Sequence, residues 1–399
     1  MSYAKSLGES VNHRIYLDNA ATSFPKAPRV KEAVCAFMED IGASPGRSAH
    51  MLSIQSGRIL YQSRRLLADL LGLKDCKRVF FVHNTTMAIN VVLQGFLRPN
   101  SVVVTTQMEH NALMRPLNAL KEYLNLEIRQ IPCAPSCELD LKVARELLKG
   151  ANLLACAHIN NVSGVMIPLR ELSALARSEG VVFLLDGAQS VGCVEMSDVM
   201  EQVDFLALSA HKGLLSPMGV GALLVSDSFE IQRLEPLIFG GTGSASEEEI
   251  QPLFLPDRFE SGTPNMHGIA GMCAGIEWIN AKGIAAIHTH ELNLRNHLIK
   301  GLKNIKGVRL YGVSESLEGL GANATLSLSV DGKSVSEVGL RLDREFGICV
   351  RIGLHCNPAT HKILGSFENG GSVRVSAGVF NTHSEIESFL AALSKIAKS

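Results

Sequence analysis

The feature that most constrains the fold is a series of short, continuous apolar runs that recur between residues 78 and 225. The runs do not alternate with polar residues, which is the pattern of strands buried on both faces. They are Arg78 to Val82, Ser101 to Thr105, Glu127 to Ile131, Asn152 to Ile159, Val181 to Leu185, Val203 to Leu208 and Val220 to Val225. Helical patterns separate them, so we predict an α/β fold with a mostly parallel seven-stranded sheet covered by helices.

The pattern changes after residues 265–280, an apolar segment rich in small residues that predicts a buried helix linking two domains. A polar helix is expected over about 283–303, and three alternating runs follow it. These runs are Val308 to Tyr311, Ala324 to Val330 and Ser372 to Ser376. Alternation is typical of antiparallel sheets, so the C-terminal part is predicted to be a smaller α+β domain.

The chain has 399 residues, of which 46% are hydrophobic, and this length is enough for two domains with a large core. We therefore predict a large α/β domain over residues 15–277 and a small α+β domain over residues 278–399. The N-terminal residues 1–14 are expected to pack on the small domain.

Charge and cysteine usage argue against several classes of function. The net charge is −1, so the chain has no excess of positive charge that would indicate binding to nucleic acid or to an anionic membrane. No apolar run reaches about 18 residues, the length of a membrane span, and the start of the chain lacks the apolar core of a secretory signal. Nine scattered cysteines do not form a disulfide framework, and no second ligand cluster lies near Cys133 and Cys137. We expect a cytoplasmic protein with no metal.

One lysine arrives directly after a predicted buried strand, in the stretch Ser209-Ala210-His211-Lys212. Open α/β sheets bind ligands beyond the carboxyl ends of their strands. Considered alone, Lys212 is either a solvated loop lysine or an amine that forms a Schiff base with a carbonyl compound.

An aspartate at the end of the preceding strand favours the second interpretation. Asp186, in Asp186-Gly187-Ala188-Gln189, precedes Lys212 by one βαβ-sized step, so the two strand ends are expected to lie close in space. Alone, Asp186 is equally explained as a helix N-cap. Together, the pair is what pyridoxal phosphate needs, because the lysine holds the aldehyde and the carboxylate keeps the pyridine nitrogen protonated.

The phosphate of such a cofactor needs an anion site. Asn84-Thr85-Thr86 begins a predicted helix and offers free backbone N–H groups, the positive end of the dipole and hydroxyl donors. An ordinary threonine cap explains the same residues. Ser209 and His211 are further candidate donors, and His110 is a candidate to stack on the ring or an ordinary loop histidine.

Five motifs resemble the class V aminotransferase-like enzymes, and within them the cysteine desulfurases and selenocysteine lyases, closest to the Suf-type group. They are Tyr16-Leu17-Asp18-Asn19-Ala20-Ala21-Thr22, Glu109-His110-Asn111, Asp186-Gly187-Ala188-Gln189, Ser209-Ala210-His211-Lys212 and Ser261-Gly262-Thr263-Pro264. The matches to this family run in order from residue 15 to about 385. The resemblance implies the type I fold of pyridoxal-phosphate-dependent transferases and a homodimer.

The resemblance also implies a role for each matching residue. Lys212 would bind the cofactor aldehyde, Asp186 the ring nitrogen and Gln189 the ring oxygen, while His110 would stack on the ring. Thr85, Thr86, Ser209 and His211 would hold the phosphate, Thr263 would reach the phosphate of the neighbouring subunit, and Asn161 would lie near the substrate and the ring oxygen.

The C-terminal part carries the features that point to one member of this group. Arg351-Ile352-Gly353-Leu354-His355-Cys356 resembles the catalytic loop of the Suf-type desulfurases, in which the cysteine accepts sulfur. His355 and Arg351 lie close to Cys356 in the sequence, and such neighbours favour the thiolate form of a cysteine. Arg374 matches the arginine that binds the substrate carboxylate, and a forked guanidinium suits that task. The loop departs from the pattern at Leu354, where a histidine is usual, and again from Asn357 onward.

These residues predict an L-cysteine desulfurase that transfers sulfur to Cys356 as a persulfide and releases L-alanine, with an acceptor protein as a possible partner. An alternative is a selenocysteine lyase, a cysteine sulfinate desulfinase or an aminotransferase of the same class. A third, from a different class, is a sulfur-relay scaffold without turnover, which an intact Lys212 argues against.

Overall fold

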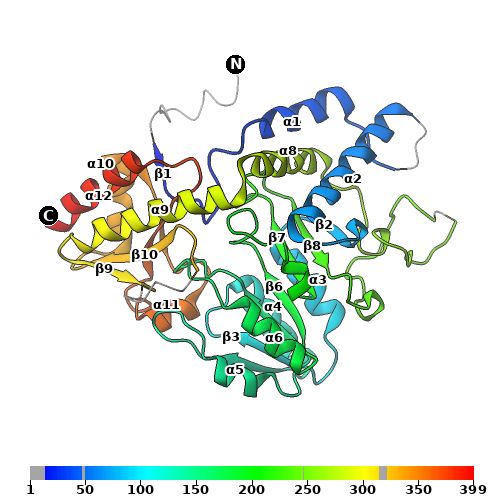
Figure 1. Ribbon diagram of the computed structural model, residues 1–399, viewed down its shortest axis with the longest axis horizontal. Helices are drawn as coiled ribbons and strands as arrows, with labels where there is room; N and C mark the ends of the chain where they lie inside the picture. Colours follow the sequence, from blue (N-terminus) through cyan, green and yellow to red (C-terminus); the bar gives the residue numbers. More distant parts are fainter. Residues whose placement is uncertain (1–13, 47–49, 246, 314–320) are drawn as a thin grey trace.

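The computed structural model describes residues 14–399 with gaps at 47–49, 246 and 314–320 (Figure 1). Its larger part is built on a seven-stranded sheet in which only the strand β8 runs antiparallel to both of its neighbours. The order is β2 (Val79–Val82), β8 (Gly221–Val225), β7 (Phe205–Ser209), β6 (Val182–Asp186), β5 (Leu153–Ala157), β3 (Val102–Thr106) and β4 (Glu127–Ile131). The predicted mostly parallel seven-stranded sheet is confirmed.

Successive residues of the central strands enter opposite cores, which explains why their sequences do not alternate. On β6, Leu184 packs in the core that includes α3 (Thr85–Phe96) and α4 (Asn111–Tyr123). Its neighbour Leu185 packs in the core on the other face. That second core is formed with α1 (Val30–Ala36), α2 (Met51–Leu71), α5 (Leu141–Leu148), α6 (Leu169–Ser178), α7 (Val199–Gln202) and α8 (Met266–Lys282). Burial on both faces makes each strand apolar throughout.

The smaller part has an antiparallel sheet and a core of its own (Figure 1, yellow to red). The strand order is β12 (Arg351–Gly353), β13 (Ser372–Ser376), β10 (Thr325–Val330) and β9 (Val308–Tyr311). Its helices are α9 (Ile284–Lys303), α10 (Val335–Phe346), α11 (Pro358–Leu364) and α12 (His383–Lys398). The domain boundary predicted between residues 277 and 278 falls inside α8 and stays a prediction.

The N-terminal strand joins the smaller part. β1 (Ile15–Tyr16) pairs in parallel with β11 (Ile348–Cys349), and Leu17 is fully buried in the same core. Arg14 forms an exposed ion pair with Asp343 on α10. The prediction that residues 1–14 pack on the small domain otherwise concerns residues 1–13, which lie outside the described residues.

Near the start of the chain, the short helix α1 continues as a π-helical turn over Phe37–Ile41. Among the helices of the described residues, none combines the length and the apolar character needed to cross a membrane.

Candidate active site

A cavity of about 290 Å³ lies at the carboxyl ends of β5, β6 and β7. The N-terminus of α3 and the loops that follow β3 and β5 complete its walls. Nine of the residues predicted to form the site line this one cavity, namely Thr85, Thr86, His110, Asn161, Asp186, Gln189, Ser209, His211 and Lys212. Its volume is close to the lower end of the range for small-molecule sites.

Lys212 follows β7 in a turn that is bonded firmly at both ends. Ala210 N donates to Val220 O at 2.9 Å, and Leu215 N donates to Lys212 O at 2.9 Å. Burial lowers the pKa of Lys212, and the charge of Asp186 partly opposes that shift. A lowered pKa enlarges the fraction of neutral amine, which is the nucleophilic form of a lysine.

The backbone just before Lys212 is held by the loop that follows β1. Lys26 Nζ donates to His211 O at 2.9 Å, and Ser23 N donates to the same oxygen at 3.0 Å. Lys26 also donates to the hydroxyls of Thr22 and Ser23, both at 3.1 Å. The sequence patterns assign Lys26 no role, although it lies four residues after the motif Tyr16 to Thr22.

Asp186 ends β6, the strand next to β7, and is 7% exposed. Its Oδ1 accepts from Ala188 N at 2.9 Å. Burial raises the pKa of Asp186, while the Ala188 N–H and the charge of Lys212 act in the opposite direction. The adjacent strand ends bring the aspartate and the lysine to one cavity, as the βαβ spacing predicts.

The helix α3 begins where its backbone can face an anion. The side chain of Asn84 caps it by accepting from Met87 N at 3.0 Å, and Thr85 N donates to Ser209 Oγ at 2.8 Å. The backbone of Asn84 lies so close to β8 that residue 221 must be a glycine, because a Cβ there would lie 2.8 Å from Asn84 Cα. Among the described residues, His211 Nδ1 is buried without a hydrogen-bond partner. Helix terminus, hydroxyls and an unused imidazole nitrogen together suit a phosphate.

His110 is a neutral imidazole held in one orientation. Its Nδ1 accepts from Ala112 N at 3.0 Å, which caps α4 and places the hydrogen on Nε2. Burial, helped by the charge of Lys212, lowers the pKa of His110 to about 4. The ring therefore offers the cavity an uncharged face and an N–H donor at neutral pH.

Cys356 is exposed and lies in the turn between β12 and α11. It does not line the cavity, but its carbonyl accepts from Asn111 N at 2.9 Å, and the next residue, Asn357, does line it. The thiol-bearing turn is therefore bonded to the segment that carries His110.

The expectation that His355 favours the thiolate is wrong. His355 is 5% exposed and its Nε2 lies 3.0 Å from Ser372 Oγ. Burial and the charge of Arg374 lower the pKa of His355 to about 2, so the ring carries no positive charge at neutral pH. His355 therefore supplies no positive charge to the turn that carries Cys356.

Arg374 lies on β13 and is 2% exposed. One nitrogen donates to Asp18 Oδ1 at 2.9 Å and another to the carbonyl of Asn161 at 3.1 Å. Its Nε has no partner among the described residues. The sequence patterns assign Asp18 no role of its own, although it follows the apolar run Ile15 to Leu17 directly, much as Asp186 ends its own strand.

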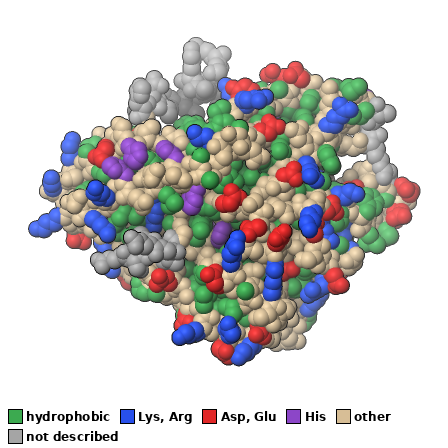
Figure 2. Space-filling view, in the orientation of Figure 1, with side chains coloured by type: hydrophobic (Ala, Val, Ile, Leu, Met, Phe, Trp, Pro, Cys, Tyr) green, Lys and Arg blue, Asp and Glu red, His purple; other side chains and the backbone are tan. Residues whose placement is uncertain are grey.

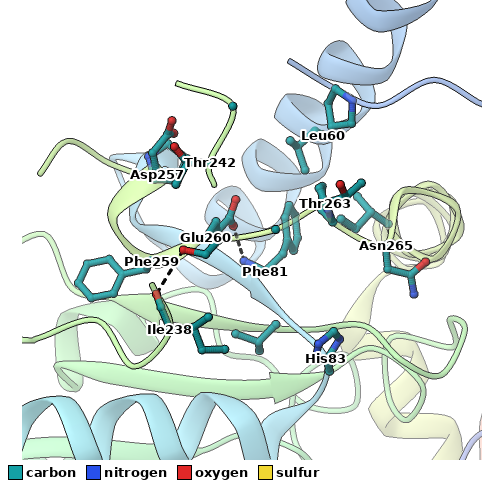
Figure 3. A pocket seen from close by; sticks show the side chains of 18 of the residues that line it. Leu60, Phe81, His83, Ile238, Thr242, Asp257, Phe259, Glu260, Thr263 and Asn265 are labelled. Atoms are coloured by element: carbon teal, nitrogen blue, oxygen red, sulfur yellow. Dashed lines mark hydrogen bonds between the residues drawn. The ribbon is translucent and has the colours of Figure 1, made fainter. Parts of the chain in front are cut away.

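Thr263 lies apart from the lysine-centred cavity. It lines a second cavity of about 350 Å³, together with Leu60, Phe81 and His83 (Figure 3). The wall of this cavity is held by Glu260, which accepts from Phe81 N at 2.5 Å and pairs with the buried Arg64. Within the described part of the chain, the two cavities share no lining residue.

Fold and cavity together define an α/β protein with a lysine-centred site at the carboxyl edge of its main sheet. The family model described as Aminotransferase class-V matches residues 15–389. The chain belongs to the class V aminotransferase family.

Similar proteins are named as cysteine desulfurases. A "Probable cysteine desulfurase" from Pyrococcus abyssi is 34% identical over 391 residues, which cover 96% of this chain and 94% of that protein. The apo structure of a cysteine desulfurase from Thermococcus onnurineus has a TM-score of 0.90 at 33% identity and covers 97% of this chain and 95% of that one. A cysteine desulfurase from Escherichia coli, in an S-sulfonic acid form, has a TM-score of 0.85 at 25% identity, with 96% and 95% coverage.

Proposed function

We propose that the protein is a pyridoxal-phosphate-dependent cysteine desulfurase that converts L-cysteine to L-alanine and transfers the sulfur to Cys356 as a persulfide. The observation that carries this proposal is the placement of the Cys356 turn, whose carbonyl accepts from Asn111 N at 2.9 Å, beside the cavity of Lys212 and Asp186. A pocket lysine and a neighbouring exposed thiol are the two groups that this reaction needs.

The lining of the cavity fits the cofactor. Thr85, Thr86, Ser209 and the unpartnered nitrogen of His211 suit its phosphate, and the buried carboxyl of Asp186 suits its ring nitrogen. Lys212 would hold its aldehyde, His110 would stack on its ring and Gln189 would bind its ring oxygen. When bound, the cofactor supplies an electron sink for the Cα of the substrate.

The protein's own groups would bind the substrate and move its protons. Arg374 suits the substrate carboxylate, because it is bonded to the carbonyl of Asn161 in the cavity wall and Asp18 holds its guanidinium in place. Asn161 lines the cavity beside it. Lys212, with its lowered pKa, would take the proton from the substrate Cα and return one later.

Cys356 would receive the sulfur. Its thiolate attacks the sulfur of the substrate, the carbon–sulfur bond breaks, and the electron pair of that bond stays with the substrate Cβ, which then takes a proton. Cysteine and one thiol thus become alanine and one persulfide, and no external oxidant or reductant is needed. The exposure of Cys356 leaves the persulfide open to an acceptor protein.

A homodimer is part of this proposal. The second cavity, which Thr263 lines, is bordered by α2 and by the segment 234–258, and both carry large exposed apolar side chains. These are Met51, Leu52, Ile54, Tyr61, Ile238, Phe239, Ile250, Leu253 and Phe254. Such a surface is typical of an interface, and a second copy seated on it would let Thr263 serve the phosphate site of that copy.

A cytoplasmic location also remains a proposal. All nine cysteines are free, which is usual in reducing compartments.

The experiment that tests the function compares alanine release from L-cysteine, L-selenocysteine and L-cysteine sulfinate by wild type, Cys356→Ala and the control Cys35→Ala. We expect Cys356→Ala to lose release from cysteine by about 10³-fold, since it lacks the nucleophile. Release from the other two substrates should persist, because selenium and sulfinate leave Cβ more readily. Unchanged cysteine turnover in Cys356→Ala would contradict the persulfide step.

The same assay separates the alternatives. A selenocysteine lyase or a cysteine sulfinate desulfinase would prefer those substrates even in the wild type, and an aminotransferase would release a keto acid. A scaffold without turnover would release nothing and would show no visible absorption band from a bound cofactor.

A further inference from the structure

The turn that carries Cys356 has an unfavourable backbone for its residue types. His355 has φ 50° and Cys356 has φ 57°, so two successive non-glycine residues are left-handed. Asn357 N donates to Leu354 O at 2.8 Å and closes the turn. Two central residues with positive φ are typical of a type I′ turn, which favours Asn-Gly. Each such residue costs on the order of 1 kcal/mol, so the surroundings must hold the turn.

Each residue of the segment 355–357 is bonded to the larger part of the protein. Asn161 Nδ2 donates to His355 O at 2.7 Å, and Asn111 N donates to Cys356 O at 2.9 Å. Asn357 Nδ2 donates to Met108 O at 2.8 Å. The turn belongs to the smaller part by chain order, yet it is fixed on loops of the larger part that surround the cavity.

Asn357 forms two bonds to the larger part, more than either His355 or Cys356. It is 1% exposed, and its Nδ2 donates to Asn161 Oδ1 at 3.0 Å as well as to Met108 O. Its Oδ1 accepts from Thr360 N at 3.2 Å and so caps α11. An amide is required, because a carboxylate cannot donate and a hydroxyl has only one hydrogen for two acceptors.

We propose that Asn357 is a positioning residue for Cys356, which holds the thiol-bearing turn on the segments of His110 and Asn161. Asn357 is also where the sequence departs from the Suf-type loop. The inference rests on the proposed function, since it concerns the thiol that receives the sulfur. Its consequence is that the thiol is placed before the substrate binds, without an ordering step of the loop.

The test uses two variants and one control. Asn357→Ser keeps a good helix cap but loses both bonds from Nδ2. Asn357→Asp keeps the helix cap and the side-chain volume, and it replaces the serine variant in the test if that variant does not fold. The control is Ser334→Ala, which removes the cap of α10 in the same part of the protein, where Ser334 Oγ accepts from Glu337 N at 3.1 Å.

The first measurement is amide hydrogen exchange in the protein without cofactor. We expect Asn357→Ser to speed exchange about ten-fold in peptides that cover residues 354–357 and 111, because two bonds to buried groups are lost. Ser334→Ala should speed exchange only in α10. Exchange of the 354–357 peptide at the wild-type rate in both Asn357 variants would overturn the proposal.

The second measurement compares two substrates in the loaded enzyme. Misplacing a reacting group by about 1 Å costs on the order of 10²-fold, so Asn357→Ser should lower kcat for L-cysteine by that factor. Its kcat for L-cysteine sulfinate should stay within about two-fold of wild type. Equal losses on both substrates would overturn the proposal. If Cys356→Ala turns over cysteine normally, the proposed function fails instead, whatever the exchange shows.

Discussion

Oδ1 of Asp18 lies 2.9 Å from a guanidinium nitrogen of Arg374, and the two residues are 356 positions apart in the chain. Arg374 is almost fully buried, and the side chain of Asp18 is 18% exposed. Asp18 also lies 3.9 Å from the more exposed Arg351. The ion pair joins the loop after β1 to β13 and leaves one nitrogen of Arg374 without a protein partner among the described residues.

The buried pair predicts a large loss of stability when its acid is removed. Asp18→Asn leaves a buried guanidinium uncompensated, which should lower the free energy of unfolding by about 3 kcal/mol. The control is Glu146→Gln, which breaks an exposed pair with Lys149 and should cost less than about 1 kcal/mol. Urea unfolding of both variants measures the difference. A loss for Asp18→Asn as small as that of the control would contradict a structural role for the pair.

The location of Thr263 predicts that subunits complement one another. Thr263→Ala should lower desulfurase activity about ten-fold if its hydroxyl binds a phosphate, since such bonds contribute about 1.5–3 kcal/mol. Lys212→Ala should be inactive. In a mixed dimer, the Lys212 of the first variant faces the intact Thr263 of the second, so refolded mixtures should regain part of the wild-type activity. No gain over Thr263→Ala alone would show that Thr263 does not act across an interface.

A buried acid on α9 predicts a pH dependence of stability. Glu291 on α9 is 6% exposed, and burial raises its pKa to about 8 from the usual 4.5. The unfolded chain releases this proton above pH 4.5 while the folded protein keeps it to about pH 8, so the contribution to stability falls as pH rises through that window. Glu291→Gln has no proton to release.

The measurement is urea unfolding of wild type and Glu291→Gln at several pH values from 5 to 8. We expect the stability of the glutamine variant relative to wild type to increase steadily with pH, by about 1 kcal/mol or more across the range. A difference that does not change with pH would show that Glu291 titrates normally.

Much of the fold follows from patterns that are local in sequence. The apolar runs predict the main sheet because its central strands are buried on both faces, and successive residues such as Leu184 and Leu185 enter different cores. The edge strand β4 is only partly buried and carries polar residues. The meeting of Asp186 and Lys212 at one cavity was predictable for a similar reason, since neighbouring parallel strands end at the same edge of a sheet.

Other contacts have no local pattern and could not be predicted. The turn at His355 and Cys356 looks like an ordinary polar loop, and the left-handed backbone that its bonds to Asn161 and Asn111 stabilise is visible only in the structure. The charge of His355 could not be predicted from the sequence either. Its position next to a cysteine in the sequence suggests a source of positive charge, whereas burial and the nearby charge of Arg374 lower the pKa of His355 and keep it neutral.

The sequence by itself therefore determined the type of fold, the family and the residues that can carry the chemistry, because strand burial and strand-end motifs are properties of short segments. Only the tertiary structure decided how Cys356 is held beside the cavity, which acid faces Arg374 and which histidines stay uncharged. Those features depend on desolvation and on hydrogen bonds between segments that lie hundreds of residues apart, and neither leaves a periodic signal in the chain.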